Sequence, residues 1–191
     1  EILPETPEFY KIIKDICTRL DIPDSVTLIV LDSDEILAFY AMEANTIVFS
    51  RGICKYLIDR GLKLTIDHIA AILAHEIEHA TELIDVECHR GGILYRAKDQ
   101  QKIAEEYRAD SESLARLSRA GFNRKAVVEV LHTLPLSLGR YGISHPEQID
   151  RIRRVEGRIA DDEHPLSDTT KEMTPIPEEL YDWLSKNSDY H

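Results

Sequence analysis

Two histidines and a glutamate occur close together near the middle of the sequence, as His75, Glu76 and His79. At about 100° per residue, helix positions four apart differ by only about 40°, so both imidazoles lie on one face. Two imidazoles at this spacing can bind one zinc ion without distorting the helix. The intervening glutamate can then act as a general base on a water molecule that the zinc activates. The motif therefore predicts a zinc-dependent hydrolytic site.

Glu78 also lies between the two histidines, so a helical wheel is needed to distinguish it from Glu76. Glu76 falls among apolar neighbours such as Ile72, whereas Glu78 falls on a side shared with Asp67 and Asp85. Apolar surroundings raise the pKa of a carboxyl group toward neutrality, as a general base acting on water requires. We expect Glu76 to be the catalytic base and Glu78 to be a solvated charge.

A helix from about Thr65 to Ile84, with Thr65 as its N-cap, must carry these residues. One stripe of this helix is apolar and should face the core; it comprises Ile66, Ile69, Leu73, Ile77, Ala80 and Ile84. Both histidines lie on the opposite, polar side. His68 joins them there, and the role of an ordinary exposed residue suits it equally well.

A catalytic zinc ion needs a third protein ligand and one open position. The segment from Asp99 to Ala120 predicts a long helix in which Glu106 and Asp110 lie in or beside the apolar stripe. Burying two carboxylates is costly unless each has a partner. A zinc ion for Glu106, and a ligating imidazole that Asp110 orients, would provide both partners. We expect Glu106 to be the third ligand; the alternatives are Glu105, or a surface ion pair between Glu106 and Arg108.

Two further residues could take part in catalysis, because Tyr141 and His145 stand just before the last long helical segment. A phenol and an imidazole can each donate a hydrogen bond to the tetrahedral intermediate of peptide hydrolysis. A packing role fits both residues about as well.

The remaining patterns predict an α+β fold with a small antiparallel sheet packed on the helical part that carries the zinc site. Short runs rich in β-branched and aromatic residues, separated by turn residues, predict a meander of three strands. These runs are Val26 to Leu31, Ile36 to Met42 and Asn45 to Ser50. Other helical patterns start at Pro7, after Ser50 as a cap, at Asn123 and at Glu147, and Gly121 should end the helix of Glu106. Residues 85–98 are the expected loop.

The chain divides into two parts by composition. Residues 1–160 predict one metallopeptidase domain, whereas residues 161–191 form an acidic, proline-containing C-terminal tail with a short helical pattern at 178–186. The tail has too few apolar residues for a core of its own. We expect it either to be disordered or to lie as a strap across the active-site cleft.

Composition excludes several functions. A net charge of −12, from 23 Lys+Arg against 35 Asp+Glu, repels nucleic acid and anionic lipid surfaces. No apolar run reaches the roughly 18 residues of a membrane-spanning helix, and no signal-peptide pattern occurs. The cysteines Cys17, Cys54 and Cys88 are too far apart for a thiolate zinc site and indicate no disulfide framework. We expect a cytoplasmic protein; its oligomeric state is left open.

Further short motifs occur across residues 43 to 154. They are Ile47-Val48-Phe49-Ser50-Arg51-Gly52, Ile69 through His79, Glu106-Tyr107-Arg108-Ala109-Asp110, Ala120-Gly121-Phe122, and Ser144-His145-Pro146 followed by Arg151-Ile152. Together they resemble the gluzincin metallopeptidases that include CAAX prenyl proteases, the bacterial heat-shock membrane protease and the small soluble minigluzincins. The resemblance implies a zincin-like fold, with Glu106 as third zinc ligand and Asp110 as its supporting residue. Glu78 departs from the family, which usually has a small residue there, and the spanning helices of the membrane members are missing.

Hydrolysis of peptide bonds is the leading interpretation. The alternative is a zinc-containing regulatory or binding module with low or autoinhibited activity, because Glu78 or the tail obstructs the cleft. We expect a peptide or unfolded protein substrate to add as an extended strand alongside Asn45 to Phe49, as on an edge strand. A central or covered strand at this position is the other possibility.

Overall fold

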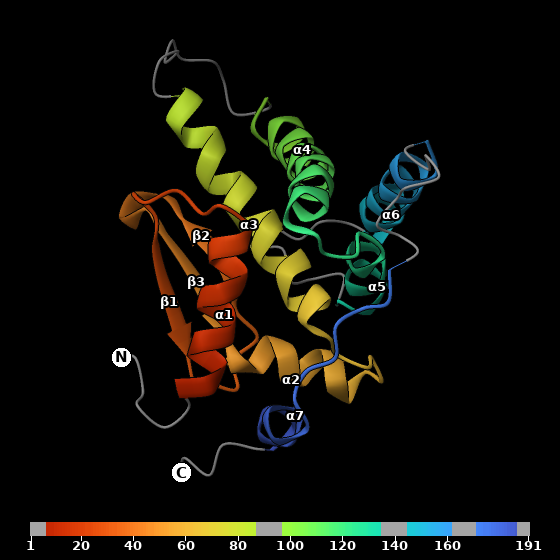
Figure 1. The fold of residues 1–191 in the computed structure, drawn as a ribbon. Coiled ribbons are helices and arrows are strands. Elements are labelled where there is room, and N and C mark those ends of the chain that lie inside the picture. The colour runs from red at the N-terminus through yellow and green to blue at the C-terminus, as the bar shows by residue number, and fades with distance from the viewer. Residues whose placement is uncertain (1–6, 87–96, 135–144, 162–170, 187–191) are drawn as a thin grey trace.

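The computed structural model describes residues 7–86, 97–134, 145–161 and 171–186, which form an α+β fold (Figure 1). The expected α+β class is confirmed. A small sheet lies on one side of the long helix α3, and α4, α5 and α6 lie on the other. In chain order the elements are α1 (Pro7–Arg19), β1 (Thr27–Leu31), β2 (Ala38–Ala41), η1 (Met42–Ala44), β3 (Thr46–Ser50), α2 (Arg51–Asp59), α3 (Ile66–Val86), α4 (Ala97–Ala120), α5 (Lys125–Thr133), α6 (His145–Asp161) and α7 (Glu178–Ser185). No described helix has both the length and the apolar character needed to cross a membrane.

The sheet has the strand order β1-β3-β2. β1 pairs with β3 in parallel, with Thr27 opposite Thr46, and β2 pairs with β3 antiparallel, with Ala38 opposite Phe49. The predicted antiparallel meander is therefore wrong: the sheet is mixed, and the last strand is inserted between the first two. The prediction that Asn45 to Phe49 forms an edge strand is wrong for the same reason, because β3 is paired on both sides.

Ser50 stands where α2 begins, but its side chain does not cap that helix as expected. Its hydroxyl donates to the carbonyl of Glu35 at 2.6 Å and accepts from the N–H of Leu37 at 3.0 Å. Ser50 therefore holds the segment that leads into β2 against the start of α2. Gly52 lies in the same contact, where a Cβ atom would come within 2.2 Å of the Glu35 carbonyl oxygen, so only glycine fits.

Helix α3 is enclosed almost completely, because α1, α4, α5, β2 and β3 all pack against it. Between Asp67 and Ala80 every residue is buried except His75 and His79. Within this stretch only the two histidines reach the surface, so the side of α3 opposite the predicted core stripe is polar but mostly covered.

At the start of α3, hydrogen bonds provide partners for the buried polar residue His68. Thr65 is the N-cap, as predicted: its hydroxyl accepts from the N–H of His68, and its own N–H donates to Nδ1 of His68 at 3.0 Å. Nε2 of His68 lies 2.9 Å from a carboxylate oxygen of Glu129 on α5. His68 is only 1 % exposed, so its reading as an ordinary surface residue is wrong.

The described part of the tail, residues 171–186, packs on the body of the protein. Its apolar side chains Ile176, Leu180 and Leu184 are buried, and α7 lies against α2 (Figure 1). Upstream of α7, the carbonyl of Thr174 accepts from the N–H of Ile66, and its N–H donates to Asp67. Residues 171–186 therefore dock at the N-terminal end of α3.

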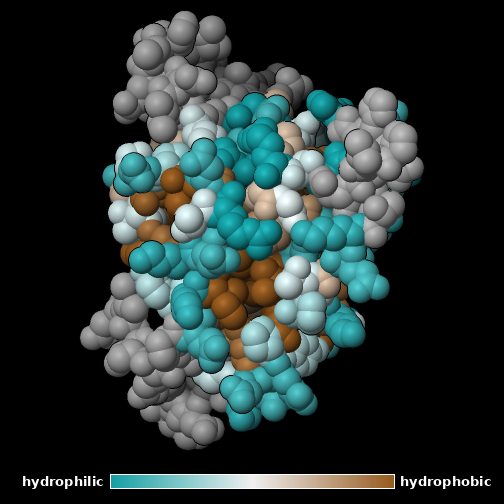
Figure 2. Space-filling view, in the orientation of Figure 1, coloured by the Kyte–Doolittle hydropathy of each residue, from teal (hydrophilic) through white to brown (hydrophobic). Residues whose placement is uncertain are grey.

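The face of the molecule seen in Figure 1 is mostly hydrophilic, as the acidic composition leads one to expect. Figure 2 shows one larger apolar area on it, where α1, α2 and the beginning of α3 meet in Figure 1. Cys17 and Cys54 are buried and free, and burial raises the pKa of the Cys17 thiol to about 12. Both cysteines therefore act as core residues; Cys88 lies outside the described residues.

Candidate metal centre

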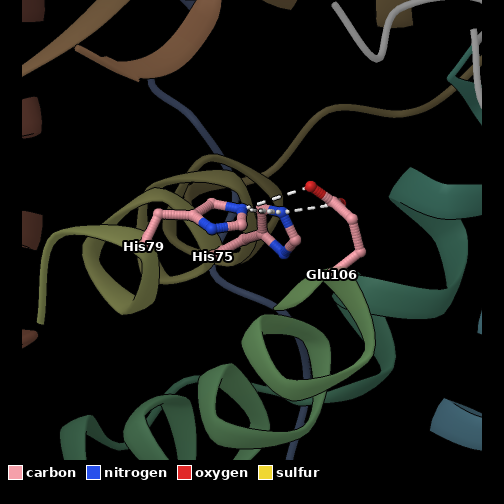
Figure 3. Close-up of side chains that lie close together, drawn as sticks. All are labelled: His75, His79 and Glu106. Atoms are coloured by element: carbon pink, nitrogen blue, oxygen red, sulfur yellow. Dashed lines mark hydrogen bonds and ion pairs between the residues drawn. The ribbon is translucent and has the colours of Figure 1, made fainter. Parts of the chain in front are cut away.

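Three of the predicted site residues converge where α3 and α4 pack side by side (Figure 3). Nε2 of His75 and Nε2 of His79 are 3.1 Å apart. Glu106 on α4 places Oε2 at 3.4 Å from the His75 nitrogen and Oε1 at 3.4 Å from the His79 nitrogen. The group contains Glu106 and not the alternative Glu105.

These distances would also allow the three side chains to hold one zinc ion. Ligand atoms at about 2.0–2.1 Å from a tetrahedral zinc ion lie about 3.3 Å from one another. The distances of 3.1, 3.4 and 3.4 Å among the three side chains surround that value. An imidazole that donates directly to a carboxylate would lie at about 2.7–3.2 Å instead. Two imidazoles and one carboxylate are also a donor set that catalytic zinc sites use.

Asp110 lies one helical turn beyond Glu106 on α4 and contacts the other nitrogen of His75, with Nδ1 and Oδ1 at 3.0 Å. This carboxylate is buried. A hydrogen bond from Nδ1 leaves the lone pair of Nε2 directed at the space shared with His79 and Glu106. Asp110 therefore lies where we expected it, in contact with the imidazole of His75 that it was predicted to orient.

Opposite charges dominate the electrostatics of the site. Burial alone would lower the pKa of His75, but the carboxylates of Asp110 and Glu106 outweigh it and raise the pKa to about 10. Burial would raise the pKa of Glu106, yet His75, His79 and Arg151 hold it far below its ordinary value. Opposite charges therefore hold the His75 and Glu106 side chains together.

The sequence analysis assigned no role to Arg151, although this residue of α6 reaches the centre of the site. Its Nε and Nη2 each lie 2.7 Å from the carboxylate of Asp110, and its Nη1 lies 3.0 Å from Oε2 of Glu106. One signal could have identified it. Arg151 falls on the same stripe of α6 as the buried Val155 and Ile159, at i, i+4 and i+8, where a lone charge requires a buried partner.

The two glutamates between the histidines have different surroundings. Glu76 is buried, and its negative charge acts on the Arg151 guanidinium together with those of Asp110 and Glu106. Glu78 is also buried, at 6 % exposure, and pairs with Arg116 of α4. The expectation that Glu78 is a solvated charge is wrong, because the outer side of α3 is covered by α4. Arg108 was the alternative partner considered for Glu106. Its guanidinium donates to the backbone carbonyl of Glu78.

Two predicted catalytic residues fall where the structure gives no side-chain position. Tyr141 lies outside the described residues. His145 is described only as the first residue of α6, the helix that also carries Arg151. Their roles as hydrogen-bond donors to a tetrahedral intermediate stay predictions.

No family model matches the sequence, and a comparison with curated proteins found no match either.

Proposed function

We propose that the chain is a zinc-dependent metallopeptidase of zincin-like architecture, with His75, His79 and Glu106 as the zinc ligands. The observation that carries the proposal is the convergence of three side chains, with Nε2 of His75 and Nε2 of His79 3.1 Å apart and each 3.4 Å from one carboxylate oxygen of Glu106. Between Asp67 and Ala80 the two histidines are also the only residues of α3 that are not buried, so a substrate can reach this stretch of the helix at the proposed metal site.

The chemistry follows from the residues around this group. When bound, zinc supplies a Lewis acid that makes a water molecule more acidic and polarises a carbonyl group. Glu76 accepts the proton from the attacking water on its carboxylate and delivers it to the leaving amine nitrogen. Asp110 holds the tautomer and orientation of His75. His145 and Tyr141 are proposed donors to the tetrahedral oxyanion.

The substrate proposed is a peptide or unfolded protein segment that adds to the sheet as an extended strand. Because β3 is central, this strand must add to β2, the edge of the sheet that packs against α3. In the described part of the chain, β3 is the only strand that pairs with β2. Pairing through backbone groups requires an extended substrate and places little demand on its side chains.

The alternative of a zinc-containing binding module rested on obstruction of the cleft by Glu78 or by the tail. Glu78 is engaged by Arg116, and residues 171–186 dock at the far end of α3. The described residues therefore lend that alternative no support, and an active enzyme is the function we propose.

Metal analysis combined with hydrolysis of an unfolded protein tests the proposal. The purified chain should contain about one zinc per molecule, cleave the unfolded protein, and lose this activity on chelation. Glu76→Gln should keep the zinc and lower the rate by about 10²–10⁴-fold. Wild-type protein that holds zinc but cleaves no unfolded substrate would favour the binding module, and protein that takes up no zinc would overturn the site itself.

A further inference from the structure

Arg151 uses every nitrogen of its guanidinium group on the two carboxylates of the site. Nε and Nη2 hold both oxygens of Asp110 at 2.7 Å, and Nη1 holds Oε2 of Glu106 at 3.0 Å. A planar guanidinium can grip two carboxylates in this way, but a lysine ammonium is a single point charge and cannot reproduce the fork.

The position of this group closes a ring of contacts. Asp110 touches Nδ1 of His75, whose Nε2 lies beside Oε2 of Glu106, and that oxygen returns to Arg151. Without a cation at this point, the buried carboxylate of Asp110 and the half-buried carboxylate of Glu106, one turn apart on α4, would repel each other. Arg151 is therefore the group that keeps both on the same side of His75.

The carboxylate of Glu106 faces both histidines as well as Arg151. Its Oε2 lies 3.0 Å from Nη1 of Arg151 and 3.4 Å from Nε2 of His75, and its Oε1 lies 3.4 Å from Nε2 of His79. The orientation of this carboxylate toward the two imidazoles is therefore tied to its contact with Arg151.

We propose that Arg151 is a positioning residue of the metal centre, which holds the Glu106 carboxylate in the orientation that faces both imidazoles. Through Asp110 it also fixes the direction of Nε2 of His75. This inference rests on the zinc site proposed above and extends it to the residue that positions two of the proposed ligands.

A merely structural ion pair between α6 and α4 is the competing explanation, and Arg116 provides the matched comparison. Its side chain is 12 % exposed against 13 % for Arg151, and it also pairs with a buried carboxylate. Its Nη1, however, donates to the carbonyls of Leu20 and Asp21 at the end of α1. Arg116 thus joins helices and touches no proposed ligand side chain.

The experiment uses Co²⁺ as a spectroscopic probe of the purified protein. The variants are Arg151→Lys, Arg151→Gln and the control Arg116→Lys. Each receives Co²⁺ after metal removal, and three quantities are measured: the visible absorption, the affinity by chelator competition, and thermal unfolding of the metal-free form. We expect the Arg151 variants to bind metal about 10–100-fold more weakly. Their Co²⁺ absorption should change, because Glu106 and His75 lose the group that orients them toward the metal.

Arg116→Lys should lower thermal stability and leave the Co²⁺ spectrum and affinity at wild-type values. Added guanidinium should restore the spectrum of Arg151→Gln. If Arg151→Lys folds and matches the wild type in spectrum and affinity, the inference is overturned while the proposed function stands. An equal spectral change in Arg116→Lys would also overturn it, since loose packing alone would then explain the effect. Absence of Co²⁺ uptake by the wild type would overturn both.

Discussion

The carboxylate of Glu78 on α3 pairs with the guanidinium of Arg116 on α4, although Glu78 is only one residue from the proposed ligand His79. Thr81 adds a hydroxyl at 3.2 Å from the other oxygen of Glu78. Glu78 therefore takes part in the contact between α3 and α4. Among the described residues, Glu76 forms no ion pair of this kind.

Glu78→Gln should consequently lower stability and leave the chemistry unchanged. Glutamine still accepts a hydrogen bond, but the Arg116 charge loses its counterion in a largely buried place, at a cost of about 1–3 kcal/mol. Thermal unfolding should shift down by several degrees. Measured well below the transition, hydrolysis per folded molecule should match the wild type. A rate loss comparable to that of Glu76→Gln would mean that Glu78 takes part in the reaction.

Glu106→Gln should weaken zinc binding by at least about 100-fold, because an amide oxygen is a poorer ligand than the carboxylate that faces both imidazoles. Chelator competition measures the effect. Glu105→Gln, on the adjacent position of α4, is the control and should bind zinc as the wild type does. If Glu106→Gln keeps its zinc at a chelator concentration that strips His79→Ala, the third ligand is another group.

The sequence predicted which side chains converge, because each member of the group lies at a fixed helical offset from another. His75 and His79 are four residues apart on one helix, and Glu106 and Asp110 are four apart on the next, so local geometry sets their directions. The juxtaposition of the two helices was inferred from the cost of burying unpaired carboxylates. That reasoning assigned an imidazole to Asp110, which His75 provides, but only the tertiary packing of α6 reveals Arg151 as a second partner.

Strand pairing was predicted poorly for a physical reason. Alternation and β-branched residues identify β1, β2 and β3 as strands, but they carry no information on which strands become neighbours. Burial distinguishes the central strand from the edge strand better than alternation does. In β3 the residues on both faces of the sheet are buried, namely Thr46, Ile47, Phe49 and Ser50. A central strand needs such enclosure, whereas β2 is half-buried throughout, as an edge strand is expected to be.

Disruption of the tail should destabilise the protein rather than activate it. Leu184 is fully buried in α7, so Leu184→Ala should cost about 2–5 kcal/mol. Glu179→Ala changes an exposed residue of the same helix and serves as the control. Thermal unfolding and hydrolysis below the transition should show a lower Tm and an unchanged rate. A faster rate in folded Leu184→Ala would instead support a tail that restrains activity.

The burial of His68 should make stability depend on pH. Burial lowers its pKa below the ordinary 6.5, and this outweighs the opposing charges of Glu129 and Asp67. The unfolded chain then binds a proton at a higher pH than the folded chain, so stability is complete above about pH 6.5 and falls as the pH drops below it. Each unit between the two pKa values contributes about 1.4 kcal/mol.

Denaturant unfolding of the wild type and of His68→Asn at pH 7.5 and pH 5 isolates this contribution. Asparagine can still accept from the N–H of Thr65 but does not titrate. The wild type should lose more stability between the two pH values than the variant does. Equal losses would mean that His68 titrates alike in the folded and unfolded chain.

Proline substitutions in β2 should show which strand receives an extended substrate. The backbone N–H groups of successive residues in a strand point alternately to its two sides. Because residues 38 and 41 are three positions apart, the N–H of one faces β3 and the N–H of the other faces the open edge. Proline at the inward position removes a bond of the sheet and should destabilise the fold. Proline at the outward position leaves the sheet intact but removes a donor to the substrate.

Ala38→Pro and Ala41→Pro are therefore each other's control. We expect one to melt at a lower temperature, and the other to fold normally while its KM for an unfolded substrate rises and its zinc content stays unchanged. The loss of one backbone hydrogen bond predicts a rise of about 2–10-fold in KM, since such a bond contributes about 0.5–1.5 kcal/mol. A normally folded variant with unchanged KM at both positions would contradict strand addition at β2. Substrate recognition would then have to come from side chains near the mouth of the site.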